Sequence, residues 1–174
     1  MNDNACHGRQ GLAKYCERCG TGLAIKRVEG KILSVCPACE HIVYLDPKVA
    51  AGVVFTLNGE IVLLKRGIEP AIGKWVFPGG YVDRGEPVPV GAAREVREET
   101  GLEVSVGDLV GVYSYPEVAV VLIVYSGIVT GGSLRGNFES LEVRSFEISN
   151  IPWDELAFPS TAAALQDWVR INGT

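Results

Sequence analysis

The feature that most constrains this chain is a group of acidic residues at the end of a predicted helix. Early prolines and a following glycine at Gly101 predict a helix over residues 87–100 that ends in a left-handed turn. On this helix Glu95, Glu98 and Glu99 stand at i, i+3 and i+4, so their carboxylates share one face. They lie in the last turns, where the helix macrodipole is already negative. A helix built for stability alone would carry lysine or arginine there.

Two interpretations of these glutamates are open from the residues alone. One is a charged helix face that points into solvent. The other is a site for a hard divalent cation, Mg²⁺ or Mn²⁺, because clustered carboxylate oxygens are the ligands that such ions prefer. Local sequence rules are most often broken at functional sites. The acidic group is therefore a candidate metal site.

The residues around this helix resemble a known motif. From Gly80, five residues lead to Glu86, seven more lead to the Arg-Glu pair at 94–95, and residues 98–102 are Glu-Glu-Thr-Gly-Leu. This resembles the Nudix box, Gly-x5-Glu-x7-Arg-Glu-apolar-x-Glu-Glu-x-Gly-apolar, at every fixed position. At average residue usage, seven fixed identities coincide on the order of once in 10⁸ to 10⁹ windows. The chain thus resembles a Nudix hydrolase, an enzyme that splits a diphosphate bond.

The resemblance implies roles for the matching positions. Glu95 and Glu99 would be the principal ligands of Mg²⁺ or Mn²⁺, with Glu98 as a further ligand or as the holder of a metal-bound water. The backbone carbonyl of Gly79 would add another ligand. The remaining box positions would be structural, with Arg94 paired to Glu86: Gly80, Glu86, Arg94 and Gly101.

A carboxylate outside the helix often assists in this family. Glu139 occupies the position where relatives carry another metal-binding or base glutamate, and Glu142 is the alternative. A plain charge at a strand edge is the competing interpretation. The bound metal would neutralise the diphosphate, orient an in-line water and lower its pKa. The expected catalytic residues are Glu95, Glu98, Glu99 and Glu139.

Two Cys-x2-Cys pairs lie near the N-terminus. Cys16 and Cys19 form one pair, Cys36 and Cys39 form the other, and sixteen residues separate them. The surrounding segment is too small for an apolar core and needs a staple. Because four thiolates fill a tetrahedral ion, the pairs predict a structural zinc with no open position. Redox-active thiols or two disulfides are the open alternatives, and Cys6-His7 is a further candidate for metal binding.

The chain is predicted to have three parts: a flexible tail at 1–13, a zinc ribbon at 14–45 and a Nudix hydrolase domain at 46–174. Asn58-Gly59 between two β-branched runs predicts a hairpin. The expected fold class is α/β (α+β), a Nudix-type α/β/α sandwich around a mixed sheet. The expected strands are 31–35, 49–57, 60–65, 75–78, 102–113, 119–130 and 142–147, with a last helix at 161–171.

A zinc ribbon directly before such a domain resembles NADH pyrophosphatases and, more closely, the group that includes plastid FAD and ADP-ribose diphosphatases. Residues 111–117, GVYSYPE, depart from the Ser-Gln-Pro-Trp-Pro-Phe-Pro segment of NADH pyrophosphatases. The resemblance therefore favours ADP-ribose and FAD over NADH, with two monophosphates as products. Aromatic residues that could stack on the adenine ring, or simply pack in the core, are Tyr81, Tyr113, Tyr115 and Phe158.

Charge and hydropathy limit which kinds of binding partner and which cellular location we expect. A net charge of −5 and a pI near 5.1 argue against broad nucleic-acid binding. No signal pattern opens the chain and no apolar run approaches the roughly 20 residues that span a bilayer, so we expect a soluble cytoplasmic protein. The resemblance implies a homodimer acting on a small nucleotide. Two alternatives are a nucleotide-sensing or nucleic-acid-binding module on the same fold, and decapping of nucleotide-capped RNA.

Overall fold

The computed structural model describes residues 13–116 and 118–172, and the chain divides between Asp46 and Pro47 into two compact units. Cys6 and His7, with most of the predicted tail, lie outside the described residues. Within the described ranges, no helix is long and apolar enough to cross a membrane.

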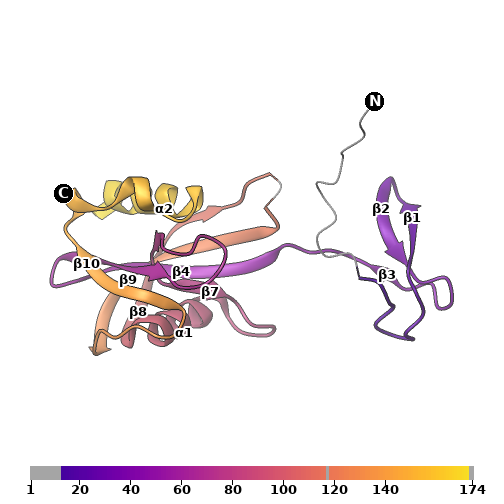
Figure 1. Ribbon diagram of the computed structural model, residues 1–174, viewed down its shortest axis with the longest axis horizontal. Helices are drawn as coiled ribbons and strands as arrows, with labels where there is room; N and C mark the ends of the chain where they lie inside the picture. Colours follow the sequence, from indigo (N-terminus) through magenta and orange to yellow (C-terminus); the bar gives the residue numbers. More distant parts are fainter. Residues whose placement is uncertain (1–12, 117, 173–174) are drawn as a thin grey trace. The chain divides into compact units, whose positions relative to one another are not determined.

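The first unit is built on a small antiparallel sheet with the order β1-β2-β3 (Figure 1). Its strands are β1 (Ala24–Val28), β2 (Lys31–Val35) and β3 (Ile42–Val43). The predicted strand at 31–35 is confirmed. In the described part of this unit the buried residues are Cys16, Ser34, Val35 and Cys36. Apolar burial is therefore too small to hold this unit together, and the cysteines dominate its interior.

The second unit contains a mixed sheet with the order β10-β5-β4-β9-β8, to which β6 and β7 add at β5 and β4. Strands β4 and β9 are parallel, and the other pairs are antiparallel. The strands are β4 (Lys48–Leu57), β5 (Glu60–Arg66), β6 (Trp75–Val76), β7 (Gly79–Tyr81), β8 (Leu102–Tyr113), β9 (Val120–Gly132) and β10 (Ser140–Phe146).

The predicted hairpin between β4 and β5 is confirmed. Leu57 pairs with Glu60, and the two residues between them, Asn58 and Gly59, have φ values of 54° and 87°. Both residues tolerate positive φ, which a two-residue turn of this kind requires. The hairpin joins the start of β5 to β4, and the end of β5 pairs instead with β6 and with β10, where Arg66 lies opposite Ser140.

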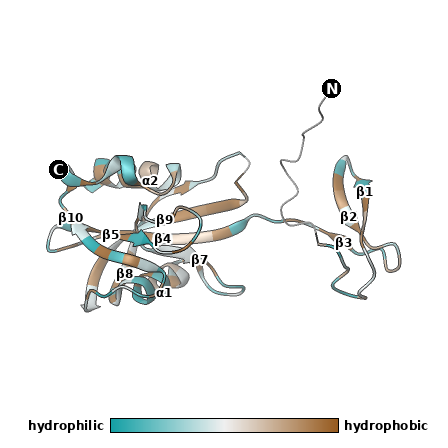
Figure 2. Ribbon diagram, viewed as in Figure 1, coloured by the Kyte–Doolittle hydropathy of each residue, from teal (hydrophilic) through white to brown (hydrophobic). Residues whose placement is uncertain are grey.

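Two helices of the described chain cover opposite faces of this sheet (Figure 1). Helix α1 (Val88–Thr100) contributes to a core cluster with Val53 and Phe55, and α2 (Pro159–Asn172) contributes to another with Val54 and Leu63. The side chains of neighbouring residues on β4 thus point to opposite faces of the sheet, because successive side chains alternate along any β-strand. Figure 2 shows mainly apolar colouring along the inner strands and mixed colouring along both helices.

The α/β/α sandwich around a mixed sheet is therefore confirmed. Two short 3₁₀ helices, η1 (Ile148–Asn150) and η2 (Trp153–Glu155), connect β10 to α2. The short strands β1, β3 and β7 were not expected from the sequence. Strands β3 and β7 have too few residues for a clear alternation of apolar and polar side chains, and β1 has five residues, AIKRV, that do not alternate.

Candidate functional site

Helix α1 holds the acidic residues in place by burying its other side. Ala92 and Val96 are fully buried in the α1-side core. The helix ends at Gly101, which has φ 70° and donates its N–H to the carbonyl of Arg97 at 3.0 Å. The glutamates of the last two turns are consequently presented beside strand β7.

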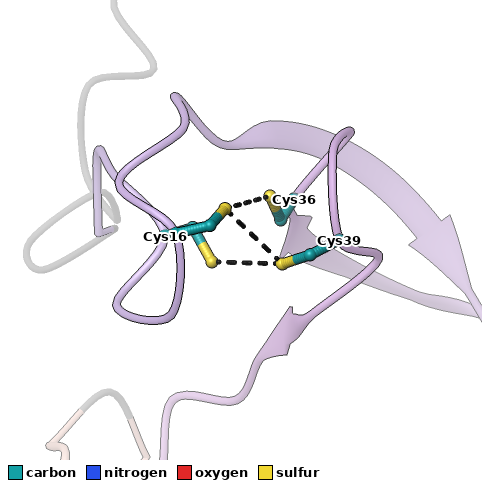
Figure 3. Close-up of side chains that lie close together, drawn as sticks. Cys16, Cys36 and Cys39 are labelled. Carbon is teal, nitrogen blue, oxygen red and sulfur yellow. Dashed lines mark hydrogen bonds between the residues drawn. The ribbon is translucent and has the colours of Figure 1, made fainter.

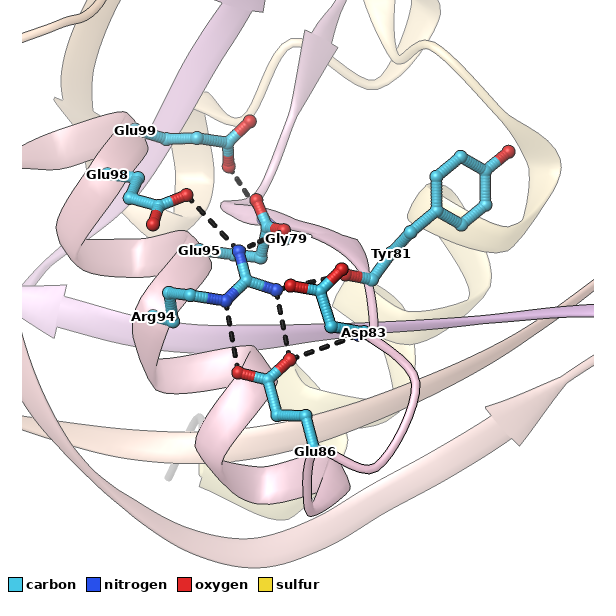
Figure 4. Close-up of polar contacts among 8 residues, drawn as sticks. All are labelled: Gly79, Tyr81, Asp83, Glu86, Arg94, Glu95, Glu98 and Glu99. Atoms are coloured by element: carbon cyan, nitrogen blue, oxygen red, sulfur yellow. Dashed lines mark hydrogen bonds and ion pairs between the residues drawn. The ribbon is translucent and has the colours of Figure 1, made fainter.

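Arg94 organises the side chains around it with its complete set of donors. Two of its nitrogens donate to the two oxygens of Glu86, at 3.0 and 3.1 Å. Its Nη1 donates to Glu95 at 2.8 Å and to Glu98 at 3.2 Å, and the second N–H of Nη2 donates to the carbonyl of Tyr81 at 3.1 Å (Figure 4). A guanidinium has five N–H groups, and all five are used. Hydrogen bonding to Arg94 lowers the pKa of Glu86, so this pair stays ionised.

Glu99 is the most buried of the acidic side chains, with 8% of its surface exposed. The backbone N–H of Gly79 donates to its Oε2 at 2.8 Å. Burial raises the pKa of Glu99 to about 8, and the charges of Glu95 and Glu139 act in the same direction. A carboxylate that is costly to ionise alone is well suited to a divalent cation, which stabilises the ionised form.

Glu139 acts on the same group of carboxylates from a different part of the chain. Its charge raises the pKa of Glu95, for which burial is the main cause, and also that of Glu99. Its peptide is held in place, because the carbonyl of Glu139 accepts the N–H of Gly67 at 2.6 Å. The alternative, Glu142, forms an exposed ion pair with Arg144 at 3.7 Å instead.

Two glycines of β7, Gly79 and Gly80, lie very close to their neighbours. A Cβ atom at Gly80 would lie 2.6 Å from the carboxylate of Glu95, and one at Gly79 would lie 2.6 Å from the carbonyl oxygen of Ala51. The atoms near Gly79 are backbone atoms of β4, so this position must be glycine for β7 to lie this close to β4, whereas at Gly80 only the end of the Glu95 side chain would have to shift.

The acidic oxygens do not converge on one point. In the part of the chain that the structure describes, the group of metal-binding side chains whose ligand atoms all lie within 4.8 Å of one another is the cysteine group, not the glutamates. Glu95 and Glu98 are directed at Arg94, and Glu99 at Gly79 (Figure 4). Like charges repel, so separation is the expected arrangement of the side chains by themselves.

The cysteines, in contrast, point toward one another (Figure 3). Sulfur–sulfur distances are 3.4 Å for Cys19–Cys36 and 3.6 Å for both Cys16–Cys39 and Cys19–Cys39, and none of the four is in a disulfide. Tetrahedral zinc with bonds of about 2.3 Å places its sulfurs about 3.8 Å apart. The group therefore fits a single zinc ion.

The local environment favours the thiolate form that a metal needs at Cys19 but not at Cys39, whose pKa is raised to about 12 by hydrogen bonding to the other cysteines and by burial. Hydrogen bonding between the Cys19 sulfur and the Thr21 hydroxyl, at 3.4 Å, lowers the pKa of Cys19 to about 6. His41 is occupied elsewhere, because its Nε2 lies 3.0 Å from the carboxylate of Glu17. The four sulfurs leave no position for a fifth ligand.

The four aromatic candidates lie in different environments. Tyr113 donates its hydroxyl to Asp167 at 2.9 Å and packs on the α2 side of the sheet, so the structure does not bring it to the glutamates of α1. Tyr81 is half exposed, with Lys48 over its ring at 4.5 Å, and Figure 4 shows the ring directed away from Arg94. Tyr115 is 40% exposed in the loop after β8.

Phe158 contacts Arg66, a residue that the sequence patterns did not single out. It is partly buried just before α2, and the guanidinium of Arg66 lies 5.3 Å from the centre of its ring. While burial raises the pKa of Glu99, the charge of Arg66 opposes that rise. Arg66 precedes Glu99 by more than thirty positions, so no local spacing signals their proximity.

A protein-family model described as the NUDIX domain matches residues 46–170. An ADP-ribose pyrophosphatase of Methanocaldococcus jannaschii is 36% identical over 149 residues, which cover 83% of this chain and 86% of that protein. An NAD-capped RNA hydrolase NudC of Stutzerimonas stutzeri is 30% identical over 80% of this chain but only 50% of its own length. The crystal structure of a NUDIX hydrolase from Nitrosomonas europaea superposes with a TM-score of 0.86, at 33% identity, over 93% of this chain and 94% of the other.

Proposed function

Because the chain belongs to the NUDIX hydrolase family, whose members generally use a divalent metal cation, we propose that it hydrolyses the diphosphate bond of an X-linked nucleoside diphosphate. ADP-ribose and FAD are the favoured substrates, ahead of NADH, and the products are two monophosphates. The observation that carries this proposal is the buried Glu99 beside Glu95, with Glu139 acting on both.

The choice of substrate has two supports. A relative that is 36% identical over most of both chains is named an ADP-ribose pyrophosphatase. In addition, residues 111–117 do not carry the segment found in NADH pyrophosphatases, and Tyr113 within them is hydrogen-bonded to α2 rather than directed at the acidic group.

In the proposed site, Glu95, Glu98, Glu99 and the carbonyl of Gly79 hold Mg²⁺ or Mn²⁺, with Glu139 as an additional ligand or as the base. The cation supplies charge neutralisation at the diphosphate and a lowered pKa for the attacking water. Glu139 would accept the proton of that water; in support, its peptide is fixed to Gly67 and its charge contributes to the raised pKa of Glu99. Arg94 orients Glu95 and Glu98 and has no donor left for substrate.

We further propose that residues 14–45 form a zinc ribbon, that residues 46–174 form the hydrolase domain, and that the protein acts as a homodimer. The support for a structural zinc is the convergence of four sulfurs in a unit with few buried apolar side chains. Sedimentation of the purified protein tests the homodimer.

The test of the activity is a substrate panel in the presence of Mg²⁺ or Mn²⁺: ADP-ribose, FAD, NADH, dinucleoside polyphosphates and nucleoside triphosphates. We expect the highest kcat/KM for ADP-ribose or FAD, with two monophosphates detected by chromatography and no turnover in excess chelator. A strong preference for nucleoside triphosphates, or turnover that survives metal removal, would contradict the proposal.

A second candidate is hydrolysis of NAD-capped RNA, which breaks the same kind of bond in a larger substrate. It is favoured by the likeness to NudC, although this chain spans half the length of that relative. The acidic net charge of −5 disfavours a long RNA contact. A nucleotide-sensing module on the same fold is disfavoured because every carboxylate of the motif is retained. Adding NAD-capped RNA to the panel separates these functions.

A further inference from the structure

Arg66 is a cation near the acidic group that the proposed mechanism has not used. Arg94 spends all five of its N–H groups on protein oxygens, so it cannot bind a phosphate without losing its partners. Arg66 has a different set of contacts. Its Nε donates to the carbonyl of Pro70 at 2.7 Å, and one terminal nitrogen makes a long contact of 3.5 Å with the carbonyl of Glu69. Three of its N–H groups are left.

The partners of Arg66 hold it without neutralising it. Both accept as backbone carbonyls, and none of the ion pairs among the described residues includes this arginine. The ring of Phe158 lies 5.3 Å from the guanidinium carbon, a distance typical of a cation–π contact. The guanidinium is thus oriented on two sides while its charge remains available to a ligand.

The sheet places this guanidinium at the edge of the proposed active site. Arg66 is the last residue of β5 and pairs with Ser140, directly after Glu139. The next residue, Gly67, donates its N–H to the carbonyl of Glu139. The chain before Phe158 is anchored as well, because Ala157 donates its N–H to Trp75 on β6, which pairs with β5.

We propose that Arg66, braced by Phe158, binds the phosphate oxygens of the substrate that face away from the acidic helix, and so determines the affinity for the diphosphate. A guanidinium fork matches two phosphate oxygens at once, which a lysine ammonium cannot do. Its positive charge would also offset the repulsion between the four glutamates and a dianionic diphosphate. This inference rests on the proposed function and adds a specificity-determining residue to it.

The variants Arg66→Gln and Arg66→Lys test the inference, with Arg144→Gln as the matched control. Arg144 also lies over aromatic rings, those of Trp75 and Phe146, but it is paired with a carboxylate, that of Glu142. With the best substrate of the panel, we expect KM to rise about tenfold or more in Arg66→Gln and by less in Arg66→Lys, with smaller changes in kcat. Phe158→Leu should raise KM by about threefold, since it removes the ring but keeps apolar bulk.

Inhibition by AMP and by adenosine distinguishes phosphate binding by Arg66 from a merely structural role of this residue in the loop at 67–73. If Arg66 binds phosphate, the Ki of AMP rises in Arg66→Gln while that of adenosine, which has no phosphate, does not. Equal rises for both, or a KM within twofold of wild type, would overturn the inference. Should wild type hydrolyse nothing in the panel, the proposed function fails by itself. Calorimetry with Mg²⁺ and inorganic pyrophosphate then decides the inference, which is overturned if Arg66→Gln binds pyrophosphate as tightly as wild type.

Discussion

The two candidate metal sites of this protein are built in opposite ways. Four cysteine sulfurs already lie 3.4 to 3.6 Å apart along the contacts that join them. The glutamates of α1 are separated, two directed at Arg94 and one at the N–H of Gly79. The glutamates are held by hydrogen bonds to other groups of the protein, whereas the sulfurs are in contact with one another. The difference is the one expected if the cysteines hold a structural metal and the glutamates a catalytic one.

The surroundings of the two sites also differ, in the amount of apolar core that supports each of them. Helix α1 is supported by a core in which Val53, Phe55, Ala92 and Val96 are fully buried. The cysteine unit has little beyond Val35 and its own sulfurs in the interior. We therefore expect metal loss to unfold the first unit, while the hydrolase unit loses activity and keeps its fold.

The largest effect is expected for Cys36→Ser. Cys36 is fully buried, and zinc binding by four thiolates contributes on the order of 10 kcal/mol to the folding of small metal-stapled segments. Zinc content measured by mass spectrometry should fall toward zero, and amide exchange over 24–43 should become fast. The matched control is His41→Asn, which should keep its zinc because His41 pairs with Glu17. An unchanged zinc stoichiometry in Cys36→Ser would exclude the ribbon.

The next effect is expected for Glu99→Gln. The amide keeps the volume of the side chain and loses the charge, so kcat should fall by about a thousandfold or more while circular dichroism stays the same. Glu103→Gln removes an exposed charge at the start of β8 and should leave kcat within about twofold. Near-normal turnover of Glu99→Gln would refute its assignment as a metal ligand.

A smaller effect separates the two candidate assisting carboxylates. Glu139→Gln should lower kcat by about a hundredfold, because a positioned base contributes roughly that much. Glu142→Gln should change it by less than about threefold, since Glu142 is engaged with Arg144 at the surface. Steady-state kinetics of both variants decides the matter, and the reverse ranking would move the role to Glu142.

The smallest effect is a dependence of stability on pH. The pKa of Glu99 is about 8 in the folded protein against an ordinary 4.5, so between these pH values the folded state holds a proton that the unfolded state has lost. Stability of the metal-free protein should therefore fall as pH rises through this window, by a few degrees in Tm. Glu99→Gln should flatten the slope, and Mg²⁺ should restore Tm at pH 8 in wild type alone. A slope that persists in Glu99→Gln would assign it to other groups, of which Glu95, with its raised pKa, is the first.

Much of the fold was predictable where a local pattern was long or chemically specific. Strand β8 has the predicted bounds, α1 ends at the predicted glycine, and Asn58-Gly59 forms the predicted turn. Strands β3 and β7 were missed because two or three residues cannot show a period. The length and spacing of a pattern, rather than its importance to the site, decided what could be predicted.

By itself the sequence determined the features that depend on short spacing: three glutamates on one helical face, and two cysteine pairs able to clamp an ion. Tertiary structure alone decided how deeply Glu99 is buried, that the charge of Glu139 acts on it, and that Arg66 lies over the ring of Phe158. The physical reason is the distance along the chain over which each effect acts. Helical spacing acts over one turn of backbone, whereas burial and charge depend on which strands the sheet brings together, and only the folded packing specifies that.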